Sequence, residues 1–284
     1  MRALSRTLGV AAIALAAAIG SAIPAHAITG GEPDGNGHPN VGLILFYDGS
    51  GPTGRYRCSA TLVTPRVLIT AAHCTDGTAG KTLVTFDSTI AEQPPSGFPV
   101  AADPYAGYTS AEITGAGKVA GTAITHPNYS NFTDMDNWND VGVVVLDEPI
   151  YNITPATLAT DNYLDGFAQP LLNSTIFDIV GYGTEVRKPD SGPQKPQPMS
   201  YPLIRRYTTS PGQKLTPQIV QLNGVPNDTR GGGGTCFGDS GGPIFLNGKL
   251  VAVTSYGYTD NCRYLGGYQR IEIPVVENWL AGIL

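Results

Sequence analysis

Short apolar runs, separated by turn residues, recur along most of the chain. Several of these runs are rich in β-branched residues and are bounded by Gly, Pro, Asn or Asp, which is typical of strands. The predicted strands cover residues 41–47, 55–63, 66–71, 141–146, 174–181, 243–246 and 249–254. Asn247 and Gly248 join the last two strands and form the strongest short hairpin pattern. Only the tail, residues 275–284, predicts a helix, with Pro274 at its start.

Composition narrows the class of protein. Of the 284 residues, 36 are Gly and 23 are Pro, while only 14% are charged. A coiled coil or an α-helical repeat needs many charged helix formers and few helix breakers, so both are excluded. The hydrophobic content of 41% is high enough to build a core, unlike that of a disordered chain. Together with the strand pattern, these proportions predict an all-β protein.

The first 27 residues have the pattern of a secretory signal peptide. Arg2 and Arg6 precede an apolar run at residues 8–19, and Ala25-His26-Ala27 offers a small-x-small cleavage pattern. The apolar run is too short to span a bilayer. We therefore expect a secreted protein whose mature form has no membrane segment. The net charge of −6 argues against nucleic acid or anionic membranes as partners.

The rest of the chain is long enough for two domains of about 130 residues each. Between residues 151 and 173 it becomes polar and rich in turn residues, which is typical of a linker. We expect a first domain at residues 28–155 and a second at residues 156–284.

Cysteine usage fits an oxidising compartment. The four cysteines all follow the leader, at Cys58, Cys74, Cys236 and Cys262. An even number in an exported chain predicts two disulfides, and the spacing alone leaves three pairings open. A zinc site is disfavoured because no C-x-x-C pair exists. Asp134 and Asp136 do not fit the EF-hand spacing, so we expect neither a metal nor another cofactor.

Three short segments carry residues suited to nucleophilic catalysis. His73 follows an apolar strand in Thr-Ala-Ala-His-Cys, Asp140 opens the apolar run 141–146, and Ser240 lies in Gly-Asp-Ser-Gly-Gly-Pro. A serine hydroxyl is a poor nucleophile until a base takes its proton, and a buried carboxylate holds that base in the useful tautomer. Glycines beside the serine allow a tight turn that points N–H groups at a developing oxyanion.

These motifs resemble those of the chymotrypsin-like (trypsin-fold) serine endopeptidases. The start Ile28-Thr-Gly-Gly, the Ala-Ala-His-Cys segment, Asp140 and the Gly-Asp-Ser-Gly-Gly-Pro segment all match, and with weaker matches they span residues 28–284. The order His, Asp, Ser separates this family from the subtilisins and the α/β-hydrolases. The resemblance implies two six-stranded antiparallel β-barrels, an active site in the cleft between them and a short C-terminal helix. His73 and Asp140 then belong to the first barrel, and Ser240 belongs to the second.

The resemblance also implies a role for each site residue. Ser240 is the nucleophile, His73 the general acid and base, and Asp140 the orienting carboxylate. The N–H groups of Gly238 and Ser240 form the oxyanion hole, and Ser255 hydrogen-bonds Asp140. The implied disulfides join Cys58 to Cys74 and Cys236 to Cys262. The spacing of 67 residues between His73 and Asp140 is long for the family, so we expect an expanded loop within residues 75–121.

Specificity and activation are further expectations from the resemblance. The implied substrate-binding residues are Gly234, Thr235, Ser255, Tyr256, Gly257 and Gly266. Gly234 stands where an acid would select Arg or Lys, so we predict cleavage after large apolar residues. Elastase-like cleavage after small residues is the second choice. Trypsin-like cleavage is the third, since it would need an acid such as Asp260 to reach into the pocket. Removal of the leader would free the amino group of Ile28 to pair with Asp239.

The expected partners are protein or peptide substrates and protein protease inhibitors, and the expected state is a monomer. A different class of function remains open, namely an inactive protease-fold binding module. Such a protein usually lacks one of the three catalytic residues, and all three are present here.

Overall fold

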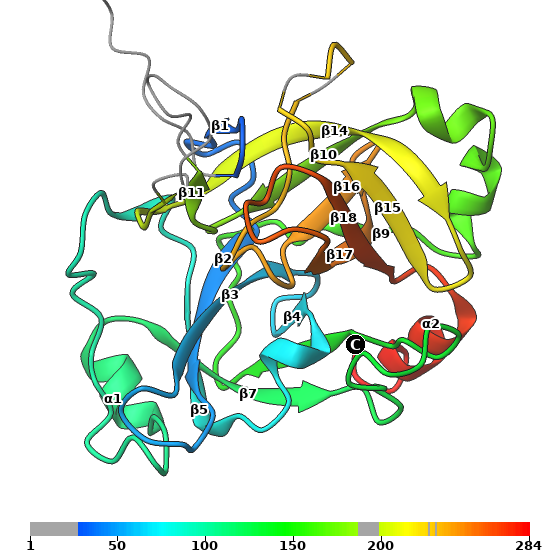
Figure 1. Cartoon of the computed structure of the whole chain (residues 1–284). Coiled ribbons are helices and arrows are strands. Elements are labelled where there is room, and N and C mark those ends of the chain that lie inside the picture. Colours follow the sequence, from blue (N-terminus) through cyan, green and yellow to red (C-terminus); the bar gives the residue numbers. More distant parts are fainter. Residues whose placement is uncertain (1–27, 187–198, 227, 231) are drawn as a thin grey trace, which may run out of the picture.

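Two closed barrels of antiparallel strands form the body of the molecule (Figure 1). The computed structural model describes residues 28–186, 199–226, 228–230 and 232–284, and the predicted leader lies outside them. The expectation of an all-β fold with two six-stranded antiparallel barrels is confirmed. No helix among the described residues is long and apolar enough to cross a membrane.

The first barrel closes in the order β2-β3-β4-β8-β7-β5. Its strands are β2 (Val41–Tyr47), β3 (Arg55–Leu62), β4 (Val67–Thr70), β5 (Ala79–Thr85), β7 (Val119–Thr125) and β8 (Gly142–Leu146). Every residue of β2 is buried, and its side chains alternate between two clusters. Ile44 and Phe46 pack within the first barrel, whereas Leu43 and Leu45 join a cluster that also contains second-barrel residues. This double burial explains the continuous apolar run in the sequence.

The second barrel closes in the order β14-β10-β16-β17-β18-β15, with β15 returning to β14. Its strands are β10 (Ile176–Gly181), β14 (Arg206–Leu215), β15 (Ile219–Asn223), β16 (Pro243–Leu246), β17 (Lys249–Gly257) and β18 (Leu265–Arg270). Asn247 and Gly248 both have positive φ, of 51° and 73°, as the predicted hairpin between β16 and β17 requires.

Short elements complete the fold. β1 (Glu32–Pro33) pairs with β14, and β9 (Thr157–Leu158) pairs with β17. Two small sheets join β6 (Thr89–Ala91) to β13 (Leu203–Ile204) and β11 (Glu185–Val186) to β12 (Met199–Ser200). The predicted linker carries β9, η2 (Tyr163–Phe167) and η3 (Leu171–Ser174), and it buries Ala159, Leu164 and Leu172 against the second barrel.

The prediction that only the tail is helical is wrong. The tail helix α2 (Pro274–Leu280) is present, although it ends before the predicted limit. A further helix, α1 (Ser110–Gly115), lies in the first-barrel insertion, and η1 (Ala72–Cys74) follows β4. Thr109 and Glu112 form a capping box at the start of α1, with each side chain bonding the other's backbone N–H. Thr-x-x-Glu was visible in the sequence and is the signal that was missed.

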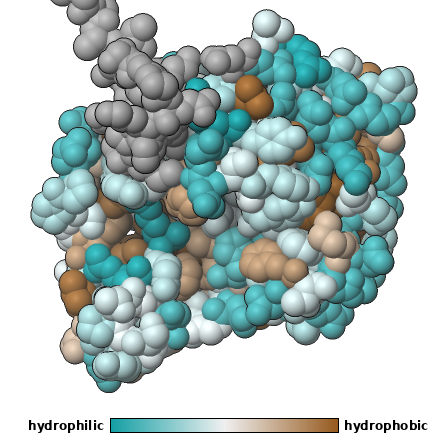
Figure 2. Space-filling view, in the orientation of Figure 1, coloured by the Kyte–Doolittle hydropathy of each residue, from teal (hydrophilic) through white to brown (hydrophobic). Residues whose placement is uncertain are grey.

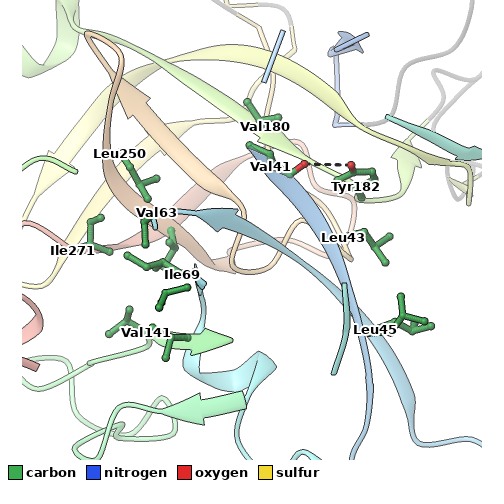
Figure 3. Packing of buried hydrophobic residues seen from close by; sticks show 14 of the residues in the cluster. Val41, Leu43, Leu45, Val63, Ile69, Val141, Val180, Tyr182, Leu250 and Ile271 are labelled. Carbon is green, nitrogen blue, oxygen red and sulfur yellow. Dashed lines mark hydrogen bonds between the residues drawn. The ribbon is translucent and has the colours of Figure 1, made fainter. Parts of the chain in front are cut away.

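Side chains from both barrels meet in one apolar cluster, which fixes the barrels relative to each other (Figure 3). Val41 and Leu43 come from the first barrel and Val180 and Leu250 from the second. Tyr182 is fully buried at this junction, and its hydroxyl donates to the carbonyl oxygen of Val41 at 3.3 Å. The two barrels are therefore packed into one continuous apolar core.

Arg205 adds a polar link at the same junction. Its guanidinium is fully buried and donates to Asp34, to the hydroxyl of Tyr182, and to the carbonyl oxygens of Gly35, Val41 and Phe86. Burial alone would raise the pKa of Asp34, but hydrogen bonds from His38 and Arg205 outweigh it and lower the pKa to about 2. The pair is thus charged and connects the amino-terminal segment to both barrels.

Candidate active site

Strand pairing brings His73 and Asp140 together. β4 runs directly into η1, which carries His73, while Asp140 lies just before β8, and Thr70 of β4 is paired with Gly142 of β8. The Nδ1 atom of His73 lies 2.9 Å from Oδ2 of Asp140, and the backbone N–H of His73 donates to Oδ1 at 2.9 Å. Asp140 is fully buried, whereas the His73 side chain keeps 23% of its exposure. The imidazole is therefore anchored at Nδ1 while its ring reaches the surface.

Groups from the second barrel hold Asp140 in place. Ser255 on β17 donates its hydroxyl to Oδ2 of Asp140 at 2.5 Å, as the family resemblance implied. Trp138 donates its indole N–H to the Ser255 oxygen at 2.9 Å, and Gln269 on β18 accepts the Asp140 backbone N–H at 3.0 Å. Trp138 and Gln269 were not predicted as site residues. Their only sequence signals are their positions, beside Asp140 and within the Gly-Gly-Tyr-Gln-Arg segment.

The loop that carries Ser240 docks onto β3. The backbone N–H of Ser59 donates to the Ser240 carbonyl oxygen at 2.8 Å, and the Ser59 hydroxyl donates to the Gly238 carbonyl oxygen at 3.0 Å. Next to Ser59, Cys58 forms a disulfide with Cys74, the neighbour of His73. The serine and histidine segments are thus attached to the same strand. Within the described residues, no hydrogen bond joins the His73 ring to Ser240.

Glycines shape the turn around Ser240. Gly238 has a φ of +97° and Gly241 a φ of +71°, values that L side chains rarely adopt. A Cβ on Gly241 would also stand 2.0 Å from the hydroxyl oxygen of Thr70. In the described part of the chain, the N–H groups of Gly238 and Ser240 donate to no acceptor. Both are therefore free to donate to an oxyanion.

A cavity of about 200 Å³ lies beside Ser240. Of the predicted substrate-binding residues, Thr235, Ser255, Tyr256 and Gly257 line it. The cavity is closed in part by the disulfide between Cys236 and Cys262. Sequence reasoning did not place Phe237 and Thr259 in the lining, whereas Asp260 was named only as a side chain that could reach in.

Gly234 and Gly266 do not line this cavity, contrary to expectation. Gly234 pairs with Thr29 through two backbone hydrogen bonds of 3.0 and 3.2 Å. A Cβ on Gly266 would stand 2.5 Å from the hydroxyl oxygen of Tyr268, which also lies 3.3 Å from the hydroxyl of Thr235. Tyr268 thus occupies the space beside Gly266.

Asp239 is fully buried next to Ser240. Burial raises its pKa to about 7, against the lowering effect of backbone N–H groups from Cys236 and Gly183 and the charge of Arg57. Ile28 is also fully buried, and residues 28–30 run beside residues 232–234. Residue 27 precedes Ile28 in the sequence, so the Ile28 nitrogen is a peptide nitrogen in the full chain.

One group of potential metal ligands is found among the described residues, made of Cys58, His73 and Cys74. Both cysteines are bound to each other, so neither offers a thiolate. What the site offers chemically is an anchored imidazole, a buried carboxylate and a serine in a loop with free N–H groups. This is the set of groups that serine hydrolases use.

Comparison with known proteins identifies the family. Residues 28–280 match the family model described as Trypsin, so the chain belongs to the trypsin family of serine proteases. A trypsin from Saccharopolyspora erythraea is 32% identical over 238 residues, which cover 81% of this chain and 86% of the relative. A brachyurin from Leptuca pugilator is 27% identical and covers 86% of this chain and 93% of its own length.

A solved structure titled HL collagenase has the same fold. It superposes with a TM-score of 0.59 at 18% identity and covers 89% of this chain and 98% of its own.

Proposed function

We propose that this chain is a secreted serine endopeptidase that hydrolyses peptide bonds through an acyl-enzyme on Ser240. His73 takes the hydroxyl proton as the Ser240 oxygen bonds to the scissile carbonyl carbon. The proton then goes to the leaving amine as the C–N bond breaks, and a water molecule, deprotonated by His73, later releases the acyl group. The N–H groups of Gly238 and Ser240 hold the oxyanion in both steps.

The observation that carries this proposal is the complete burial of Asp140 against the Nδ1 atom of His73. Burying a carboxylate is costly unless it is fully hydrogen-bonded. Here Ser255 and the His73 backbone meet part of that need, and the imidazole meets the rest. In this position the carboxylate fixes the proton on Nδ1, which leaves the other ring nitrogen free to act as a base.

A fluorophosphonate probe tests the nucleophile directly. The leaderless protein that starts at Ile28 should be labelled once, on Ser240, and should hydrolyse casein. The Ser240→Ala variant, checked for folding by circular dichroism, is the matched control and should take up no label. Folded wild-type protein that neither reacts with the probe nor cleaves any peptide would support the inactive binding module instead.

Large apolar side chains are the proposed preference at the residue before the scissile bond. A cavity of 150 Å³ is enough for a benzene ring, so about 200 Å³ accepts an aromatic side chain. Burying that side chain contributes about 2 kcal/mol. The predicted substrate-binding residues that line the cavity carry no carboxylate that could bind a basic side chain. Preference for large apolar groups is therefore ranked above elastase-like preference for small ones.

Chromogenic peptides that differ only at this residue check the ranking. Phe and Leu should give a kcat/KM at least about tenfold above Ala and above Arg, because one buried side chain is worth a factor of this size. Asp260 is the observation that favours the trypsin-like alternative, since its exposed carboxylate borders the cavity. A preference for Arg that disappears in Asp260→Asn would replace the apolar assignment with the basic one.

Activation by removal of the leader is also part of the proposal. A free amino group at Ile28 would supply a positive charge to the buried Asp239. The burial of Ile28 and the pairing of residue 29 with residue 234 support this, because these contacts keep the start of the mature chain near the loop that carries Ser240. The two disulfides are consistent with export. We further propose domain limits at 28–155 and 156–284, a monomeric state, and protein inhibitors as possible partners.

A further inference from the structure

A second and larger cavity, of about 540 Å³, lies on the side of the first barrel. One wall is formed by β2 and β3, another by residues 91–100 of the long insertion, and a third by Tyr201 and Leu203. Figure 2 shows the molecule hollowed in this region, on the left, with apolar residues inside the hollow. Leu43, Leu45 and Phe98 supply apolar lining. The long first-barrel insertion thus helps to form this cavity through residues 91–100.

The charged residues in the described lining of this cavity are two arginines. Arg55 and Arg57 lie two residues apart on β3, so both side chains project from the same face of the strand. Among the described residues that line it there is no Asp or Glu, although acids outnumber basic residues in the chain as a whole. Arg55 donates to the carbonyl oxygen of Pro99 at 3.1 Å. The Arg57 side chain donates no hydrogen bond to a described residue, although its guanidinium is partly buried.

Arg57 also reaches the catalytic loop. Its Nε atom lies 2.8 Å from the position that a Cβ on Gly238 would take. The charge of the buried Asp239 attracts it, while burial lowers its pKa. A free Ile28 amino group would replace Arg57 as the positive charge that balances Asp239. The Arg57 charge would then be available to a ligand. The guanidinium therefore stands where the catalytic loop meets the large cavity.

The two cavities are lined mainly by different barrels. The 200 Å³ pocket and β17 belong to the second barrel, whereas the 540 Å³ cavity is lined largely by the first barrel, and they share no lining residue. If the residue before the scissile bond occupies the smaller pocket, the chain beyond that bond leaves in the other direction. An extended peptide advances about 3.3 Å per residue, so its first three residues cover about 10 Å.

We propose that the large cavity binds the leaving-group side of the substrate and that Arg57 selects an acidic side chain within the first three residues after the scissile bond. This inference rests on the proposed peptidase function. The apolar lining buries the stem of the Asp or Glu side chain and its neighbours, and the guanidinium binds the carboxylate through charge-assisted hydrogen bonds. The expected ligand is therefore a peptide segment that is apolar apart from one carboxylate side chain.

Internally quenched peptides with an amidated carboxyl terminus test this directly. Each carries Phe before the scissile bond and Glu, Gln or Lys at the first, second or third position after it. At one position Glu should exceed Gln by about tenfold in kcat/KM, the size of one charge-assisted bond, and Lys should be the poorest. The ratio of Glu to Gln should shrink as salt rises from 0.05 to about 0.5 M.

Variants assign the effect to Arg57. Arg57→Gln should bring the ratio of Glu to Gln close to one, and Arg57→Lys should retain part of the preference. Arg66→Gln, at an exposed arginine of the same barrel, should change neither rate. If Arg57→Gln slowed all peptides equally, Arg57 would serve Asp239 and the subsite would be disproved. Equal rates for Glu and Gln at all three positions would also overturn it.

A binding measurement separates this inference from the proposed function. The Ser240→Ala chain is titrated with fluorescent peptides that carry Glu or Gln at the selected position. About tenfold tighter binding of the Glu peptide supports the subsite even if the wild-type chain proved inactive towards the fluorophosphonate. Equal binding refutes the subsite even if hydrolysis is rapid. Tighter binding only when the peptide ends in a free carboxylate, with no effect of an internal Glu, would refute the assignment to a side chain.

Discussion

Asp140 depends on contacts from both halves of the molecule. Its own barrel supplies the His73 imidazole and backbone N–H, while the second barrel supplies Ser255 and the amide oxygen of Gln269. Each of these groups forms a hydrogen bond with a polar atom of Asp140, which is fully buried and has no access to water. The carboxylate therefore takes its final position only when the two barrels are packed together.

Replacing Asp140 with Asn should remove most activity and leave the fold intact. The amide is nearly isosteric, but it can donate to Nδ1 and favour the wrong imidazole tautomer, so kcat should fall by on the order of 10⁴. Ser255→Ala removes one hydrogen bond from the same carboxylate and should cost far less, about tenfold. Steady-state kinetics on an apolar peptide measure both. Equal losses in the two variants would contradict the orienting role of Asp140.

The candidate catalytic residues could be proposed from sequence because each lies in a short contiguous motif. Ser240 is surrounded by glycines that a tight turn needs, and His73 adjoins a cysteine. Trp138 and Gln269 could not be found in this way, because their roles arise from packing between segments over a hundred residues apart. The position of the Arg57 guanidinium could likewise not be predicted, since it depends on the insertion and on Gly238.

At the scale of elements, the strands that could be predicted are those with continuous apolar runs. β2 and β8 are buried on both faces and were clear from sequence. β14 was not, because its ten residues include Pro211 and Gly212, which weaken a strand pattern. In the structure its pairing with β15 shifts register between Gly212 and Lys214, so the strand continues through a bulge. Helix α1 was missed because its six residues are too short to show helical periodicity.

The disulfide between Cys58 and Cys74 joins β3 to η1 and closes a separation of 16 residues. Replacing both cysteines with Ala should lower the free energy of unfolding by about 3 kcal/mol, as expected for a loop of this size. Activity should fall as well, because β3 carries the contacts of Ser59 to the Ser240 loop. Urea denaturation of the variant in the Ser240→Ala background, which prevents self-digestion, measures the first effect. A change below about 1 kcal/mol would contradict this account.

At the scale of the whole molecule, the amino-terminal junction couples stability to pH. With residues before Ile28, Asp239 has a pKa of about 7 in the folded chain against 3.8 in the reference state. Between these values the folded chain holds a proton that the unfolded chain has released, so the free energy of unfolding falls as pH rises from about 4 to 7. A free, charged amino group at Ile28 would lower that pKa and reduce this fall.

Two Ser240→Ala proteins test the coupling, one starting at Ile28 and one with a single Ala added before it. The difference in urea midpoint between them should widen from pH 4.5 to pH 7.5, with the extended form less stable. Asp34, whose pKa of about 2 gives the opposite trend at lower pH, is common to both and cancels. In the catalytically intact chain the added Ala should remove most activity. A constant difference in midpoint would show that Asp239 does not sense the terminus.

The contact between residues 28–30 and residues 232–234 also has a consequence for timing. The ribosome synthesises residues 28–30 early in translation. It synthesises residues 232–234, which contact them, more than two hundred residues later. Gln269, which holds Asp140, follows later still. A nascent chain therefore carries His73 long before it can assemble anything that cuts, and the cell is exposed to the finished activity only after nearly the whole polypeptide has been made. Premature termination anywhere before β18 should yield harmless fragments rather than a partly active protease.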